Sequence, residues 1–295
     1  MKVPTLKLPQ FKLPHLSLGN AAKKSSIAIH YTNSKIRILG LKRDKSLLFE
    51  PLEASYKDDK AQALRDMVER YNIKGQEVIA CLSVNEGLMK FYTYPSALSK
   101  KDLQNSIEWT IKRELLALKE EAYYDYYVLD SFPDPKKVGV IAVIARKETV
   151  ENVKKLIESA GLKLKVLDYE VVAIINYGLY HKLPLPFSIL HVDYDYSILV
   201  NYSTSSISYY VDQWSLAEYL ENKNEETFES FISEIVNFVV INGITSLYIA
   251  GPVLLYEDIT TRIMENVPIF GLLDLEGIPS SFFIPYSLCI RGLEE

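Results

Sequence analysis

The stretch VIARKETVENVKKLIESAGLKLKVLDYE, residues 143–170, changes its hydrophobic periodicity twice. It opens with the end of the apolar run 138–145, which reads as a buried strand. Residues 148–160 carry apolar side chains at helical spacing, and Gly161 stands where a helix commonly ends in a left-handed residue. Residues 163–167 alternate lysines with apolar residues, which is typical of a strand. The order strand, helix, strand predicts an α/β fold.

The residues before this stretch complete a module. Residues 88–94 read as a strand that ends at Pro95, and Ser99 with Asp102 forms a variant capping box at a helix start. An apolar stripe follows at Leu103, Ile107, Ile111, Leu115 and Leu118, and two strands are expected at 126–132 and 138–145. We therefore expect a strand, helix, strand, strand, helix, strand module over about residues 84–167, inside a larger α/β chain.

The two flanks of this module share a plan. Residues 27–31 and 36–41 read as a hairpin, followed by a helix around 64–71 and a strand at 78–82. After Pro184 and Pro186, three short strands at 188–192, 197–202 and 206–211 precede a helix over 228–239, a strand at 246–250 and a helix at 258–264. Such internal duplication is typical of two-lobed α/β folds.

Composition excludes several classes of protein. The chain has 295 residues, enough for two lobes, and is 48% hydrophobic and 24% charged, which is ordinary globular usage. Its longest apolar run is far shorter than a membrane-spanning helix, so we expect a cytoplasmic protein. Cys81 and Cys289 lie too far from other ligands for a predicted zinc site, and both read as core residues.

Charge divides the sequence unequally. Nine basic residues precede the first acid, Asp44, so residues 44–295 hold 24 basic and 38 acidic side chains. An acidic body argues against nucleic acid as a partner. Residues 1–22 form a basic tail with a proline at every fifth position (Pro4, Pro9, Pro14), which predicts an extended segment suited to a groove or a membrane surface, with a frayed end as the alternative.

Several segments together resemble one known family. These are IEWTIKRE at 107–114, YDYYVL at 124–129, the opening stretch 143–170 and the closing PYSLCIRGL at 285–293. Their order and spacing, over most of residues 22–295, resemble those of the PilM family of type IV pilus assembly proteins, which belongs to the actin-like ATPase superfamily. By this resemblance the chain would be a divergent member of the family.

This resemblance implies a fold and its division. The fold would be α/β and actin-like (ASKHA, ribonuclease H-like), with two lobes. Lobe 1 would span residues 23–183, with subdomain 1A and an inserted 1C-type (SHS2-like) subdomain at about 84–167. Lobe 2 would span residues 184–295, and the C-terminal helix would return to lobe 1. Because residues 211–225 are few, subdomain 2B would be reduced.

The resemblance also places a nucleotide site, whose motifs are altered here. The family's first phosphate motif, Gly-Ile-Asp-Ile-Gly, matches Ala28 to Thr32, with His30 in place of the acid and Asn33 following. The second motif keeps Asp193, the only candidate Mg²⁺ ligand, but has Asp195 in place of a glycine, and its carboxylate would repel phosphate. The adenosine motif retains Gly251, whereas Pro252 has no amide donor.

Ordinary structural roles compete with nucleotide binding at these positions. Asp193 would more often be a structural acid, His30 a hydrogen-bonded core histidine, and Gly251 a turn residue. We therefore expect a degenerate site without a cofactor, with Mg-ATP binding as the alternative.

The resemblance finally implies a role in binding. The protein would be a cytoplasmic scaffold, peripheral at the inner face of the inner membrane, that docks the N-terminal peptide of a PilN-like membrane protein between subdomains 1A and 1C. By position, Met89, Phe91, Trp109, Ile141 and Val143 would contact that peptide. Other pilus platform proteins are further expected partners, membrane association would be indirect, and homo-oligomerisation stays open.

Two rival interpretations remain. One is an actin-like ATPase or kinase of the same machinery that uses Asp193 with compensating groups elsewhere. The other is a cytoplasmic arm of type II secretion, which ranks lower because such proteins normally continue into a membrane span.

Overall fold

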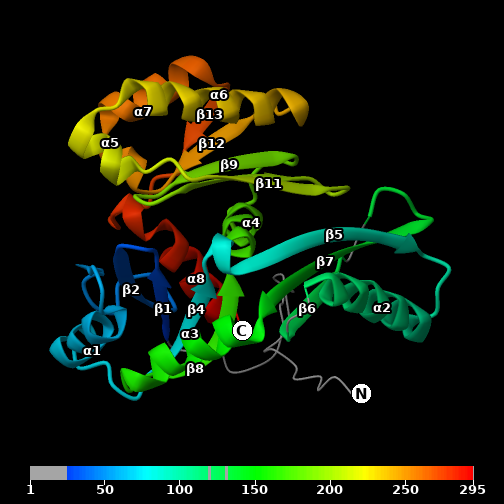
Figure 1. The fold of residues 1–295 in the computed structure, drawn as a ribbon, viewed down its shortest axis with the longest axis horizontal. Coiled ribbons are helices and arrows are strands. Elements are labelled where there is room, and N and C mark those ends of the chain that lie inside the picture. Colours follow the sequence, from blue (N-terminus) through cyan, green and yellow to red (C-terminus); the bar gives the residue numbers. More distant parts are fainter. Residues whose placement is uncertain (1–24, 119–120, 130–131, 295) are drawn as a thin grey trace.

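In the computed structural model, which describes residues 25–118, 121–129 and 132–294, two five-stranded sheets form the two lobes and a third, smaller sheet projects to one side (Figure 1). The predicted tail at 1–22 lies outside the described residues. Within the described residues, the helices are all too short or too polar to span a bilayer.

The first sheet has the strand order β3-β2-β1-β4-β8. Its strands are β1 (Ser25–Tyr31), β2 (Lys35–Lys42), β3 (Leu52–Ser55), β4 (Glu77–Leu82) and β8 (Lys163–Tyr169). The expected hairpin β1–β2 is present, while β4 and β8 run parallel to β1, so helices must return the chain between them. Helices α1 (Lys60–Arg70) and α3 (Lys147–Ser159) make these connections and pack against each other.

The second sheet repeats this topology, with the order β11-β10-β9-β12-β13. Its strands are β9 (Phe187–Val192), β10 (Ser197–Tyr202), β11 (Ile207–Asp212), β12 (Leu247–Ala250) and β13 (Ile269–Leu272). The duplication predicted from the sequence is therefore confirmed at the level of strand order. Between β11 and β12 the chain holds α5 (Leu216–Asn222) and α6 (Glu225–Ile241), which lie with α7 (Glu257–Asn266) over the outer face of this sheet (Figure 1).

The third sheet has the order β5-β7-β6 and is inserted between β4 and α3. It contains β5 (Gly87–Pro95), β6 (Ala122–Val128) and β7 (Lys137–Arg146), and α2 (Lys100–Leu118) packs on one face through Ile107 and Ile111. The sequence expectation extended this module to residue 167. The structure instead places α3 and β8 with the first sheet, because β8 pairs with β4 from Glu77↔Lys163 onward.

One predicted strand is shifted in the structure. The expected strand at 126–132 is β6, Ala122–Val128, which pairs with β7 from Ala122↔Arg146 to Val128↔Val140. The ten-residue length of β7 offers pairing partners to the tyrosines before residue 126, so the strand begins earlier than its composition suggested.

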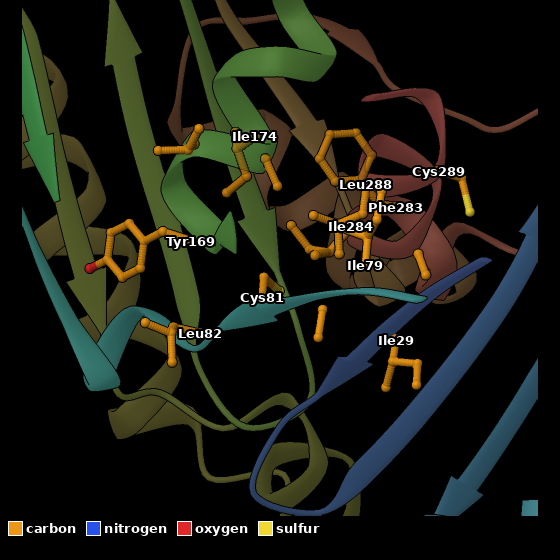
Figure 2. Close-up of a cluster of buried hydrophobic side chains, with 14 of the residues drawn as sticks. Ile29, Ile79, Cys81, Leu82, Tyr169, Ile174, Phe283, Ile284, Leu288 and Cys289 are labelled. Atoms are coloured by element: carbon orange, nitrogen blue, oxygen red, sulfur yellow. The ribbon is translucent and has the colours of Figure 1, made fainter. Parts of the chain in front are cut away.

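Two helices lie between the five-stranded sheets. These are α4 (Glu170–Tyr180) and the C-terminal α8 (Phe283–Glu294), which follows the short 3₁₀ turn Ser280–Phe282 (Figure 1). Figure 2 shows Ile174 of α4 and Phe283, Ile284 and Leu288 of α8 near Ile79 and Cys81 of β4. Helix α8 packs on β1, β2 and β4 of the first sheet.

Candidate functional site between the lobes

The two turns that correspond to the altered phosphate motifs face each other. The turn after β1 places Ser34 against Asp195 in the turn after β9. The Ser34 backbone N–H donates to Asp195 Oδ2 at 3.0 Å, and its hydroxyl donates to Oδ1 at 2.8 Å. Within its own turn, Thr32 Oγ1 accepts from the Lys35 N–H at 3.2 Å, and Tyr56 donates its hydroxyl to the Thr32 carbonyl. The turn after β1 is thus fixed by its own hydrogen bonds, and the two turns are bonded to each other.

A buried ion pair lies directly behind these turns. Arg37 of β2 donates to both Asp193 carboxylate oxygens, at 2.6 and 2.8 Å, and its Nε donates to Glu53 at 2.8 Å. Arg37 and Asp193 both have 0% exposure. Burial by itself would raise the pKa of Asp193, but the Arg37 charge and hydrogen bonds hold that pKa well below its usual value. The pair joins the first lobe to the second with a fork geometry that is typical of strong arginine–carboxylate recognition.

A second buried group extends the network from Arg37. Arg37 Nη1 lies 3.4 Å from His30 Nδ1, and His30 Nε2 lies 2.6 Å from Glu170 Oε1. Because a guanidinium can only donate, His30 Nδ1 is the acceptor. His30 Nε2 therefore carries the hydrogen and donates a hydrogen bond to Glu170. Glu170, at the start of α4, also accepts from the Tyr196 hydroxyl and the Val84 N–H, each at 2.6 Å. The carboxylate of Glu170 is therefore satisfied from both lobes.

His30, Cys81 and Glu170 are residue types that bind metals, and their ligand atoms lie within 4.8 Å of one another. Their surroundings do not fit a cation. The His30 and Glu170 atoms are engaged in hydrogen bonds, the Arg37 cation is adjacent, and burial raises the pKa of the Cys81 thiol, which favours the neutral form. The cluster fits a hydrogen-bonded core better than a metal centre.

The third predicted motif packs against the same region. Gly251 has a φ of 96°, and a Cβ there would lie 2.6 Å from His191 Nδ1 and 2.8 Å from the Val192 carbonyl oxygen. Glycine is therefore required both by conformation and by the close approach of His191. Pro252 is buried at the start of the 3₁₀ turn Pro252–Leu255, and His191 Nε2 lies 3.5 Å from Asp193 Oδ2.

The structure brings most of the predicted nucleotide positions to this interface. Ala28, His30, Thr32 and Asp193 are buried, and Asp195 bonds across to Ser34, whereas Asn33 is exposed. Sequence reasoning missed Arg37, Glu170 and Tyr196. An available signal was the charge of Arg37 in the otherwise apolar strand IRILGL, since a charge in such a strand needs a buried partner.

A separate hollow of about 700 Å³ opens between the first lobe and the inserted sheet. Its walls come from the start of α1, the end of β1, the beginning of β5, the end of β7 and one face of α3. Apolar lining residues are Ala61, Leu88, Ile144, Ala145, Val153 and Leu156, and charged ones are Asp58, Asp59, Lys60, Glu86 and Arg146. Such a mixture of apolar and charged walls suits an extended peptide better than a nucleotide.

None of the five predicted partner residues lines this hollow. Met89, Phe91, Ile141 and Val143 share the face of the inserted sheet that packs on the main core. Trp109 is on α2 with 61% exposure, and the Arg113 guanidinium lies 5.0 Å from its ring centroid. The structure thus groups four of the five and places Trp109 apart.

Residues 50–205, slightly more than half of the chain, match the family described as type IV pilus assembly protein PilM. No curated protein sequence matches.

Solved structures share the whole fold. A PilM-PilN type IV pilus biogenesis complex aligns with a TM-score of 0.75 and 14% identity, covering 92% of this chain and 99% of that one. The cytoplasmic domain of EpsL, an inner membrane component of the Vibrio cholerae type II secretion system, aligns with a TM-score of 0.53 and 14% identity over 91% of this chain and 94% of that one. The ethanolamine utilization protein EutJ of Carboxydothermus hydrogenoformans gives a TM-score of 0.54 and 8% identity, with coverages of 91% and 92%. The chain has an actin-like fold and belongs to the type IV pilus assembly protein PilM family.

Proposed function

We propose that this protein is a scaffold of the inner-membrane platform of a type IV pilus, or of a related secretion or DNA-uptake machine, whose lobes are closed by its own side chains instead of a nucleotide. The observation that carries this proposal is the buried Arg37–Asp193 pair, reinforced by the Ser34–Asp195 bonds between the two turns. Protein groups occupy the place where phosphates would have to enter.

The free energies of these interactions favour closure by protein groups over phosphate binding. A phosphate drawing Arg37 away would leave the buried Asp193 unpaired, and removing one partner of a buried ion pair costs about 3–5 kcal/mol. The same phosphate would face Asp195, and two like charges 4 Å apart repel by about 4 kcal/mol near a protein surface. Together these terms are comparable with the whole binding energy of a micromolar ligand, about 8 kcal/mol.

The scaffold role needs a docking site, which we place in the hollow between the first lobe and the inserted sheet. Support comes from its mixed apolar and charged walls and from the structural match to a PilM-PilN complex. The occupant would be the short N-terminal peptide of a PilN-like membrane protein. Through that partner the protein would be held at the cytoplasmic face of the inner membrane.

The direct test is fluorescence titration with a synthetic peptide of the PilN-like protein from the same genome. Asn152 is exposed on α3 and lines the hollow, so Asn152→Trp should obstruct it and weaken binding at least tenfold. The matched control is Asn237→Trp, at an exposed position of α6 in the second lobe, which should bind like the wild type. Equal binding by both variants would remove the hollow as the docking site.

A further inference from the structure

A second hollow of about 460 Å³ adjoins the first and shares Arg146 with it. Its other lining residues are Glu121, Lys147, Glu148 and Glu151. We call the two hollows together the α3 trough. Its lining contains six acidic side chains (Asp58, Asp59, Glu86, Glu121, Glu148, Glu151) and three basic ones (Lys60, Arg146, Lys147). The trough therefore combines apolar lining residues with an excess of negative charge.

Some of these charges are already paired. Lys147 lies 2.7 Å from Glu121, and Glu151 accepts from the Tyr123 hydroxyl at 2.9 Å. Glu86 accepts from the Tyr31 hydroxyl at 2.8 Å and from the Ser83 N–H at 2.9 Å, both neutral donors, and its charge is partly offset by Lys60 in the same hollow. A basic occupant would meet this remaining negative field.

The sequence of this chain contains a segment with the complementary chemistry. Residues 1–24 carry five lysines and no acidic residue. Within them, Leu6, Leu8, Phe11 and Leu13 recur between prolines at every fifth position, a spacing that excludes a continuous helix. An extended chain with alternating apolar and basic side chains is the class of ligand that an apolar trough with acidic walls accepts.

The N-terminal segment is also long enough to contact the trough of its own molecule. The described chain begins at Ser25, the first residue of β1, and Tyr31 at the other end of β1 lines the hollow. The strand between them spans about 20 Å at about 3.3 Å per residue. Residues 18–24 can cover about 23 Å when extended, which leaves the repeat at 3–17 free to enter the trough.

We propose that residues 3–17 bind in the α3 trough of their own chain and compete there with the partner peptide. The choice of competitor rests on the proposed function, whereas the tail contact itself does not. The tail would act as an internal ligand that the partner must displace, so partner affinity would be lowered in the full-length protein by the fraction of molecules in which the trough is filled.

Zero-length carbodiimide coupling of full-length protein, read by mass spectrometry, tests the contact. We expect Lys7 and Lys12 to couple to Asp58, Asp59 or Glu148, and not to the exposed Glu234 and Glu257 of the second lobe. The full-length variant L6S/L8S/F11S/L13S keeps every tail lysine and proline, and its coupling to the trough should fall at least fivefold. Coupling that is equal at the trough and at the second lobe, or unchanged in the variant, would overturn the proposal.

Two further readouts separate the alternatives. In a mixture of light and heavy-nitrogen protein, coupled peptide pairs should be uniformly light or uniformly heavy; mixed pairs would assign the tail to a second copy and overturn the intramolecular contact. The partner peptide should bind the tail variant several-fold more tightly than the wild type. If the tail couples to the trough but the partner peptide does not bind, only the proposed function is contradicted. If the partner peptide binds the tail variant and the wild type equally well, the proposed competition is contradicted.

Discussion

At the residue scale, the main feature of the lobe interface is its network of buried charges. Arg37 neutralises Asp193 from within the first lobe, so the buried carboxylate has a cation that the protein itself provides. The altered motif at Ala28 to Thr32 could be read from the sequence, and so could the loss of an amide at Pro252. The partner of Asp193 could not, because Arg37 lies 156 residues away and only the fold brings the two together.

Breaking this pair should destabilise the protein strongly. Asp193→Asn leaves the Arg37 charge buried with only Glu53, so the free energy of unfolding should fall by about 3–5 kcal/mol. The surface variant Glu225→Gln, which breaks the exposed pair with Arg262, should cost far less, because solvent screens exposed ion pairs. Urea unfolding measures both. The double variant R37M/D193L should lose less than the sum of its single variants, since no unpaired charge remains; additive losses would show that the pair is not coupled.

Acid should weaken the same interaction. The pKa of Asp193 is depressed in the folded protein, so its ion pair contributes full stability above the unfolded-state pKa of about 3.9 and loses it as pH falls through the folded value. The stability difference between the wild type and Asp193→Asn should therefore be constant near neutral pH and shrink below about pH 4. A difference that grows on acidification would contradict the assignment.

At the element scale, periodicity predicted most strands and helices because each buries one face. Sequence analysis missed β3, β13, α4 and α5. The strands β3 and β13 have four residues each, too few for a periodic signal, and α5 has seven. Helix α4 is buried on nearly all sides between the sheets, so it lacks the polar face that marks an amphipathic helix. The sequence also did not show that β8 belongs to the first sheet and that α3 leads into it. This placement depends on the pairing of β8 with β4 across the insertion.

The contact of α8 with the first sheet offers a test at this scale. A Cβ at Gly292 would lie 2.2 Å from Ser26 Oγ and 2.4 Å from Ile79 Cδ1. Gly292→Ala should lower the free energy of unfolding by about 1–3 kcal/mol through overpacking, although alanine is the better helix former. At Gly271, the nearest side-chain atom would be 3.4 Å away, so Gly271→Ala should have little effect. The midpoint of thermal unfolding of each variant measures these effects. An unchanged midpoint for Gly292→Ala would argue against the α8 packing.

At the scale of the whole molecule, two sheets of the same strand order enclose α4 and α8, and an inserted sheet stands beside them (Figure 1). The duplication was visible in the sequence as a repeated order of elements. The hydrogen bonds between the two lobes could not be predicted from the sequence. They join residues that only the fold brings together, such as Ser34 with Asp195 and Glu170 with Tyr196. Closure of the lobes by the protein itself would leave the inserted sheet and the adjoining hollow as a permanent docking surface.

The most direct test of this account is isothermal titration calorimetry of the wild-type protein with Mg-ATP, followed in the same cell by the PilN-like peptide. We expect no saturable heat from Mg-ATP up to about 1 mM, a concentration that corresponds to only about 4 kcal/mol of binding energy. We also expect saturable binding of the peptide, which would show that the sample is competent. Saturable Mg-ATP binding at micromolar concentration would contradict this account, because the Arg37–Asp193 pair and the Ser34–Asp195 bonds could not then be closing the nucleotide site.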